Sequence, residues 1–233
     1  MKFIVQGLIK AFWMLVTLDP EVVRITLLTL KVTITATIIS VLVGIPLGTF
    51  LALRLFRGRN LIVTLVNAGM GMPPVLVGLW VSLFLWRYGP LGFLNAMYTP
   101  TAIVIAQGII ASPLVTGFTI AAIQQINPRL RLQILALGAS RWQMLVLLLR
   151  EARLALLAGI IAGFGGVISE VGAAMMVGGN IKGLTRILTT AMALEVSKGQ
   201  FDLAIALSFI LLALIIGITL GLTLIQQRGH ASS

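Results

Sequence analysis

The chain has 233 residues, of which 59% are hydrophobic and only 10% are charged. A typical soluble domain is about 45–50% apolar and about 25% charged. A chain of this size could not hide so much apolar surface from water, so the composition excludes an ordinary soluble enzyme and a disordered chain. It predicts a polytopic membrane protein.

The first apolar segment, residues 3–18, is short for a membrane span and contains Lys10. A spanning helix needs about 20 mostly apolar residues. We therefore expect residues 1–21 to form an interfacial helix and its lead-in, with a sixth, short span as the alternative. A cleaved signal peptide is not expected, because no small-residue cleavage site followed by a soluble domain is evident.

Five longer apolar windows follow, each with few or no charged residues. They cover residues 32–53, 60–86, 100–125, 154–177 and 203–227. Because each window is long enough to cross the hydrocarbon core as a helix, the sequence predicts an all-α transmembrane domain over residues 22–228. Residues 229–233 are expected to form a disordered tail.

The net charge of +11 is unevenly distributed between the two ends of these expected spans. One side carries nine basic residues and a single acid, Glu151; the nine are Arg54, Arg57, Arg59, Arg129, Arg131, Arg141, Arg150, Arg153 and Arg228. The other side has Arg87, Lys182, Arg186 and Lys198 against Glu170, Glu195 and Asp202. The positive-inside rule makes the nine-residue side, with the C-terminus, cytoplasmic. This explains the excess charge without nucleic-acid binding.

Residues 127–153 form the most informative connector between spans. Asn127 and Pro128 favour a helix start, Gly138 interrupts the pattern, and Ser140 with Gln143 has the spacing of a capping box. Two short cytoplasmic helices are therefore predicted. Two interpretations remain open: an interfacial connector with arginines that reach the headgroups, or a rigid docking element for a cytoplasmic partner.

The second window contains Pro73 and Pro74, with glycines close by. Proline removes a hydrogen-bond donor and breaks a helix, and broken helices at membrane depth face a cavity or protein interior. We expect a bend that lines a pore, with Met70 and Met72 as apolar gate side chains. A packing kink with methionines filling gaps is the alternative.

The sequence lacks the usual residue sets of catalysis. It has no cysteine, and its single histidine is His230, so a metal site built on these residues and a Ser-His or Cys-His pair are not expected. A Gly-x4-Gly-Lys-[Ser/Thr] phosphate loop is also missing, so we do not expect this chain to hydrolyse ATP. No acid lies in the middle of an expected span, which disfavours an ion-coupled secondary transporter.

The segment 137–142, Leu-Gly-Ala-Ser-Arg-Trp, is similar to the coupling-helix motif of ABC importer permease subunits. Further segments agree in the same order: residues 30–32, 71–78, 168–174 and 177–186. Over residues 22–227 the chain resembles the tungstate/molybdate-type permeases, and the last segment resembles the tungstate branch in particular. Two features depart from the family pattern. Arg131-Leu132-Gln133 stands where Glu-Ala-Ala is usual, and the Leu-Pro that commonly follows is missing near Arg150-Glu151.

This resemblance implies a type I ABC importer transmembrane fold with five core helices and a cytoplasmic coupling helix. The residues that would contact the ATPase are Gly138, Ala139, Ser140, Arg141 and Trp142. The chain would form a homodimer in the cell (inner) membrane, with two cytoplasmic ATPase subunits that bind ATP and Mg and an extracytoplasmic oxyanion-binding protein. ATP-driven closure of the ATPases would expose the pore alternately to each side. Another small oxyanion, or a secondary transporter, is the alternative.

A mostly apolar pore must still offer hydrogen-bond donors to an oxyanion. Ser169 joins the expected pore and gate residues Met70, Met72, Pro73 and Pro74. The expected anion approach consists of Gly178, Gly179, Asn180, Thr185, Arg186, Thr189 and Thr190. Arg186 is the preferred cation, with a solvated loop arginine as the alternative. Glu170 would repel an anion, so we expect it to pair with Lys182 or Arg186, or to contact the binding protein.

Overall fold

The computed structural model describes residues 5, 8–9, 12–14, 16–17 and 19–228. Within these residues the regular structure is entirely helical, as the sequence predicts. Half of the expected interfacial helix at residues 3–18 lies outside the described residues. The expected disordered tail, residues 229–233, lies wholly outside them.

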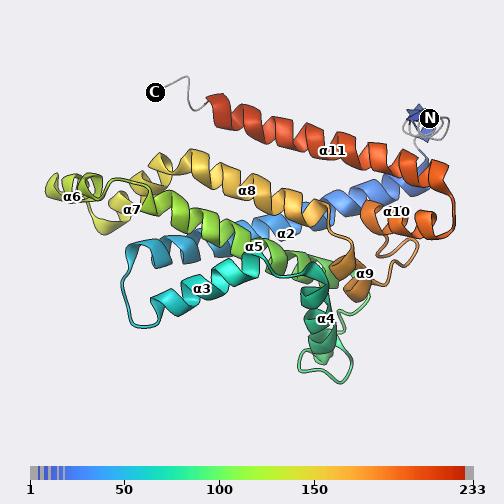
Figure 1. Ribbon diagram of the computed structural model, residues 1–233, viewed down its shortest axis with the longest axis horizontal. Coiled ribbons are helices and arrows are strands. Elements are labelled where there is room, and N and C mark those ends of the chain that lie inside the picture. The colour runs from blue at the N-terminus through green and yellow to red at the C-terminus, as the bar shows by residue number, and fades with distance from the viewer. Residues whose placement is uncertain (1–4, 6–7, 10–11, 15, 18, 229–233) are drawn as a thin grey trace.

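The helices are arranged along one long axis (Figure 1). In chain order they are α2 (Pro20–Leu53), α3 (Arg59–Met70), α4 (Pro74–Leu85), the short 3₁₀ helix η1 (Gly92–Leu94), α5 (Pro100–Gln124), α6 (Pro128–Ala136), α7 (Arg141–Glu151), α8 (Arg153–Ile168), α9 (Gly172–Gly178), α10 (Leu188–Ser197) and α11 (Phe201–Arg228). Helices α2, α5, α8 and α11 run side by side along this axis, with α6 and α7 at one end and α9 and α10 towards the other.

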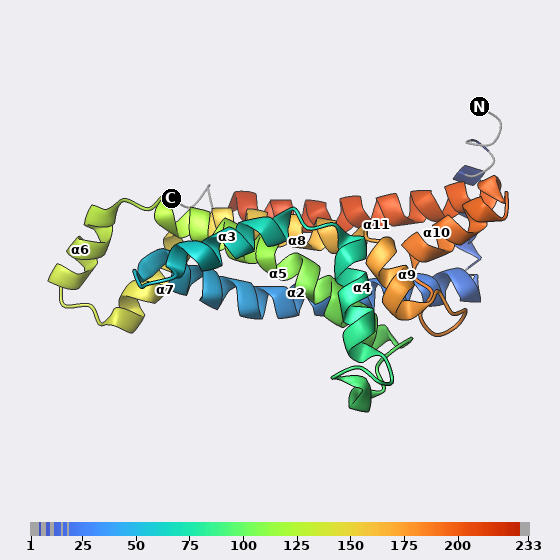
Figure 2. The same cartoon turned by 60° about the horizontal axis from the view of Figure 1, so that its bottom comes forward.

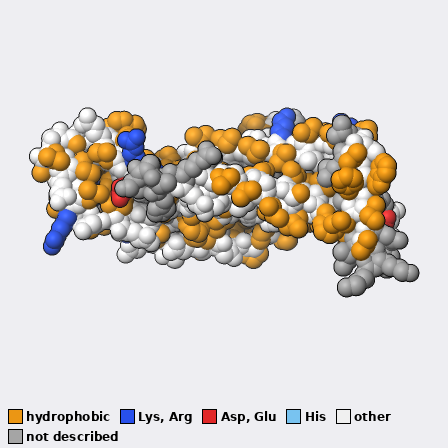
Figure 3. All heavy atoms as spheres, turned by 90° about the horizontal axis from the view of Figure 1, so that it is seen from above, with side chains coloured by type: hydrophobic (Ala, Val, Ile, Leu, Met, Phe, Trp, Pro, Cys, Tyr) orange, Lys and Arg blue, Asp and Glu red, His pale blue; other side chains and the backbone are white. Residues whose placement is uncertain are grey.

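Three of the described helices, α2, α5 and α11, are long and apolar enough to cross a membrane alone. The pairs α3 with α4 and α8 with α9 also qualify, but each pair is sharply bent. Counting each pair as one span gives the predicted five. In the view over α11, hydrophobic side chains spread along the surface and charged side chains are few, as expected of a surface in contact with lipid (Figure 3).

The first long helix begins earlier than the predicted residue 32. Its start is Pro20, which needs no hydrogen-bond partner in a first turn. The Asp19 carboxylate caps the helix by accepting hydrogen bonds from the main-chain N–H groups of Glu21 at 2.9 Å and Val22 at 3.1 Å. Helix α10 is a second departure, because its residues lie between the predicted windows 154–177 and 203–227.

Close packing between α2 and α5 depends on small residues. A methyl group added at Gly48 would lie 2.6 Å from Thr119 Cβ and 2.7 Å from the main-chain oxygen of Thr116, so the backbones approach too closely for any side chain. Such contacts are typical of the GxxxG pattern in membrane helices. Gly217, which has the same sequence pattern on α11, faces open space.

The described structure gathers the predicted basic side at one end. The C-terminal ends of α2, α5 and α11, the start of α3, and helices α6 and α7 all lie there (Figures 1 and 2). The opposite end holds the start of α2, helix α10 and the beginning of α11. The charge asymmetry read from the sequence is therefore an asymmetry between the two ends of the folded chain.

The Gly48 contact predicts opposite effects of one substitution at two glycines. We expect Gly48→Ala to lower the thermal unfolding temperature of the purified protein, at a cost of about 1–3 kcal/mol, because the added methyl overpacks the α2–α5 contact. Gly217→Ala should leave stability unchanged or raise it by up to about 1 kcal/mol, since alanine favours the helix. Equal effects of the two variants would contradict the proposed packing.

Candidate functional site

Two helix breaks define the centre of the candidate site. Helices α3 and α4 meet at 106° across residues 71–73, and α8 and α9 meet at 58° across residues 169–171. The first break was predicted from its sequence: α3 ends at Gly71, and Pro73 and Pro74 open α4, where a missing N–H is tolerated. The second break contains no proline and was not predicted.

The two half-helices that follow these breaks pack against each other near their N-termini (Figures 1 and 2). A methyl group at Gly172 of α9 would lie 2.6 Å from Val75 Cγ2 of α4. One turn later, a methyl group at Gly78 would lie 2.6 Å from Ala173 Cα. Pro73 and Pro74 have no N–H group, and the Leu76 N–H donates to the Pro73 main-chain oxygen at 2.9 Å, so few main-chain donors at the start of α4 remain free.

Glu170 caps the second half-helix rather than joining an ion pair with a loop cation. Its carboxylate accepts a hydrogen bond from the Ala173 N–H at 2.8 Å, and its side chain is buried. The Thr189 hydroxyl donates to the Glu170 main-chain oxygen at 2.8 Å. The expected pairing of Glu170 with Lys182 or Arg186 was therefore wrong. A nearby main-chain donor satisfies the carboxylate, and both cations bind another acid.

The expected gate residues occupy different environments. Met70 packs onto α5, because a methyl group at Gly117 would collide with the Met70 sulfur. Met72 is exposed, and Pro73 and Pro74 form the bend. The Ser169 hydroxyl donates to the main-chain oxygen of Gly165 at 2.8 Å. The structure thus brings the two prolines close to the second break, whereas Met70 contributes to helix packing.

Gln107 is a residue of the site that the sequence analysis missed. Its side chain is fully buried on α5, and its Nε2 donates to the Val167 main-chain oxygen at 3.1 Å, directly before the second break. Its Oε1 has no hydrogen-bond partner among the described residues. The only available signal was an amide near the middle of a mostly apolar window. Gln107 holds the end of α8 against α5.

The loop between α9 and α10, residues 179–187, is tied together by its own polar groups. The Thr185 hydroxyl donates to Gly178 O at 2.5 Å and accepts from Ile181 N–H at 2.9 Å. Asn180 Nδ2 donates to Thr190 O at 3.2 Å, and Gly179 and Asn180 both have positive φ. The threonine hydroxyls expected to meet an anion donate to main-chain oxygens in this conformation.

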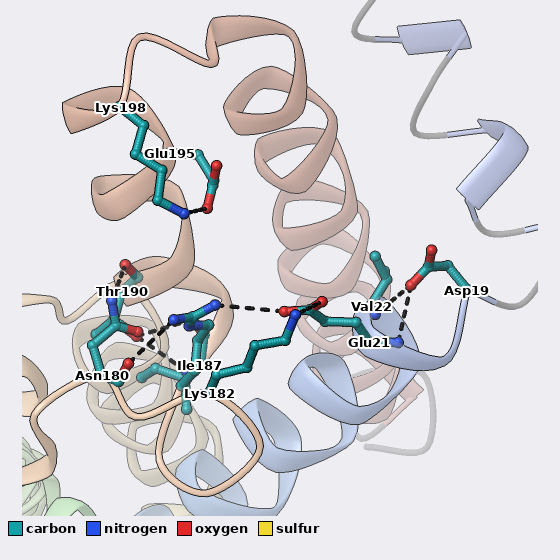
Figure 4. Close-up of polar contacts among 10 residues, drawn as sticks. Asp19, Glu21, Val22, Asn180, Lys182, Ile187, Thr190, Glu195 and Lys198 are labelled. Atoms are coloured by element: carbon teal, nitrogen blue, oxygen red, sulfur yellow. Dashed lines mark hydrogen bonds and ion pairs between the residues drawn. The ribbon is translucent and has the colours of Figure 1, made fainter.

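Two cations of this loop share one acid from the start of α2 (Figure 4). Glu21 lies 2.6 Å from Lys182 Nζ and 3.5 Å from an Arg186 terminal nitrogen. The Arg186 side chain is only 15% exposed, which excludes the solvated loop arginine considered from the sequence. A second pair joins Lys198 to the buried Glu195 at 2.8 Å.

The connector at residues 127–153 folds as predicted into two short helices, α6 and α7. Asn127 caps the first, and Ser140 and Gln143 form a reciprocal capping box at the second. Gly138 has φ +83° in the turn between them, a conformation that favours glycine. Leu137 and Trp142 are 88% and 74% exposed. They line an open cavity of about 580 Å³. Its other lining residues are Gly138, Ala139, Gln143, Val146 and Leu147.

Sequence comparison assigns this arrangement to a family. Residues 44–228 match the family described as the binding-protein-dependent transport system inner membrane component. The chain belongs to this family. Both helix breaks, the loop at residues 179–187 and the two connector helices fall within the matched region. The chain is accordingly a permease component of an ABC transporter.

Similar members of this family carry descriptions of anion transport. The tungstate uptake system permease protein TupB of Peptoclostridium acidaminophilum is 39% identical over 228 residues, 98% of this chain and 100% of that protein. A probable anion ABC transporter permease protein of Haloferax volcanii is 38% identical, over 84% of this chain and 87% of that protein. TupB of Campylobacter jejuni is 32% identical, over 91% and 89%.

Solved structures of permeases share the fold. The inward-facing MetNI methionine ABC transporter matches with a TM-score of 0.75 at 17% identity, over 91% of this chain and 98% of that chain. A bacterial alginate ABC transporter, in complex with its alginate-bound periplasmic protein, also matches with a TM-score of 0.75, at 20% identity over 95% and 86%. These similarities support the type I importer fold of the permease family.

Proposed function

We propose that this chain is the membrane-spanning permease subunit of an ATP-driven importer for tungstate or molybdate. The observation that carries the proposal is the 39% identity to a tungstate uptake permease over nearly the full length of both chains. The junction of α4 and α9 is the proposed place of passage, because two broken spans meet there in a close main-chain contact and broken helices at membrane depth face a cavity or the protein interior.

The coupling to ATP is assigned to α6 and α7. Their exposed apolar side chains, Leu137 and Trp142, border a concave surface that suits a partner on the cytoplasmic side. We infer that two copies of a separate ATPase, which bind ATP and Mg, dock at this end of the molecule. The C-terminal end of α11 lies at the same end, so both would face the cytoplasm.

Gly138 provides the test of this docking element. We expect Gly138→Pro to abolish co-purification of the ATPase while the permease still inserts in the membrane, because proline cannot adopt φ +83° and would distort the turn. Gly58→Pro is the matched control, since Gly58 has φ +89° at the same end but outside α6 and α7. Normal ATPase recovery with Gly138→Pro would contradict the assignment.

A second copy of this chain is proposed to cover α4. This helix projects away from the α2, α5, α8 and α11 bundle and is followed by a largely non-helical connection, residues 86–99 (Figure 2). Irregular main chain at membrane depth is tolerated only where protein or a water-filled cavity surrounds it. Trp80 and Leu83 are 56% and 55% exposed on the outer face of α4, which makes this face the proposed contact between copies.

Cross-linking can test this contact directly, because the chain has no cysteine of its own. Leu83→Cys should form a disulfide-linked dimer in membranes treated with a mild oxidant, whereas Leu212→Cys on α11, which is 50% exposed, should remain monomeric. Equal cross-linking at both positions would indicate random collision rather than a dimer across α4.

The proposed cycle uses the two bends as the moving elements. A binding protein outside delivers the oxyanion to the end that holds α9 and α10. ATP-driven closure of the ATPases moves α6 and α7, and helices α5 and α8 transmit this movement to the α4–α9 junction. The junction would then open first to one side of the membrane and later to the other.

The substrate assignment predicts a ranking of anions. In the reconstituted complex of permease, ATPase and binding protein, tungstate and molybdate should stimulate ATP hydrolysis well above the level seen with sulfate. The measurement is the steady-state rate of phosphate release at saturating concentrations of each anion. Equal stimulation by sulfate would contradict the tungstate or molybdate assignment while leaving an oxyanion permease in place.

A further inference from the structure

A charged pocket lies at the end of the molecule opposite α6 and α7. It has a volume of about 210 Å³ and lies between the start of α2, the loop 179–187, and helices α10 and α11 (Figure 4). Its charged lining residues are Asp19, Glu21, Lys182, Arg186, Glu195 and Lys198, and Gln200 adds an amide. Three acids and three cations therefore surround a space open to small ions.

Two of the three acids are committed to other partners. Asp19 accepts hydrogen bonds from two main-chain N–H groups at the start of α2, and Glu195 is paired with Lys198. Glu21 alone faces two cations, Lys182 and Arg186. Two cations therefore meet one carboxylate at Glu21, although the six charges of the pocket sum to zero.

Arg186 has donor capacity that the described residues do not use. A guanidinium carries five N–H donors. The hydrogen bonds that Arg186 donates to Glu21 and to Asn180 O are both long, at 3.5 Å. Its Nε is buried without a hydrogen-bond partner among the described residues. Arginine is suited to oxyanions because its donors can grip two oxygens at once.

We propose that Lys182 and Arg186 form a subsite for a tetrahedral oxyanion, and that the Glu21 carboxylate occupies the anion's place until the anion displaces it. The proposal rests on the proposed function, since it assumes that oxyanions reach this end of the chain. A carboxylate and an oxyanion both offer negatively charged acceptor oxygens to the same two cations. The two therefore compete for one position.

This competition gives the subsite a low affinity that suits transient binding. An arriving dianion must displace Glu21 from Lys182 and Arg186 before it can bind these two cations itself. The Glu21 contacts also join the start of α2 to the loop 179–187, so anion binding releases that connection. A second link remains, because the Leu188 N–H donates to the Thr29 hydroxyl oxygen at 2.9 Å. Anion arrival thus loosens the outer end without separating α2 from α10.

The test measures anion binding to the purified permease in lipid nanodiscs by titration calorimetry with sodium tungstate. Glu21→Gln removes the competing charge, so it should tighten tungstate binding by roughly fivefold, as expected for the loss of two partly exposed ion pairs. Asp19→Asn is the matched control. It removes the same charge from the same pocket, but Asp19 contacts neither cation, and asparagine also caps helices.

Two further variants test the cations. Lys182→Gln should weaken tungstate binding at least threefold, and it should fold normally because its side chain is 68% exposed. Arg186→Lys keeps the charge but loses the two-point grip, and it should weaken binding as well. The proposal is overturned if Glu21→Gln binds tungstate no more tightly than Asp19→Asn does. It is also overturned if Lys182→Gln leaves the tungstate affinity unchanged and alters only the affinity for the binding protein.

A parallel measurement separates this proposal from the proposed function. Stimulation of ATP hydrolysis by tungstate-loaded binding protein is recorded for the same variants in the full complex. Normal stimulation in the wild type, with no difference between Glu21→Gln and Asp19→Asn in anion binding, would reject the subsite alone. Tighter tungstate binding by Glu21→Gln, in a complex that no oxyanion stimulates, would support the subsite and reject the import function.

Discussion

A main-chain N–H or C=O group without a partner in hydrocarbon costs several kcal/mol, and two of the five spans of this permease are broken inside the membrane domain. Two side-chain contacts at the second break supply partners to main-chain groups. Glu170 supplies an acceptor to the second half-helix, and Gln107 supplies a donor to the end of the helix before the break. The proline pair at the first break removes the donors that would otherwise need partners.

The same constraint explains why the half-helices converge. Gly78 and Gly172 permit α4 and α9 to touch, so each shields part of the other. A side chain at either position would force the N-termini apart. The resulting junction is closely packed on its inner side, while α4 keeps an apolar outer face.

Elements that depend on local sequence patterns were predicted well, whereas elements that depend on tertiary contacts were not. The prolines of the first break and the capping residues of α6 and α7 act within a few residues, so their effect could be read directly. The second break has no such signal, because Glu170 becomes a cap only when the chain turns. The partner of Lys182 and Arg186 was assigned wrongly, since Glu21 lies at the far end of the sequence. The sequence around Gln107 also does not indicate that its hydrogen-bond partner lies on α8.

ATP-driven import of the oxyanion is tested most directly by tungstate uptake into proteoliposomes that contain the permease, its ATPase and the binding protein. We expect accumulation that requires ATP on the side of α6 and α7, requires the binding protein on the other side, and persists when ion gradients are dissipated. Uptake that continues without the ATPase and collapses with an ion gradient would contradict it, and would identify a secondary transporter instead.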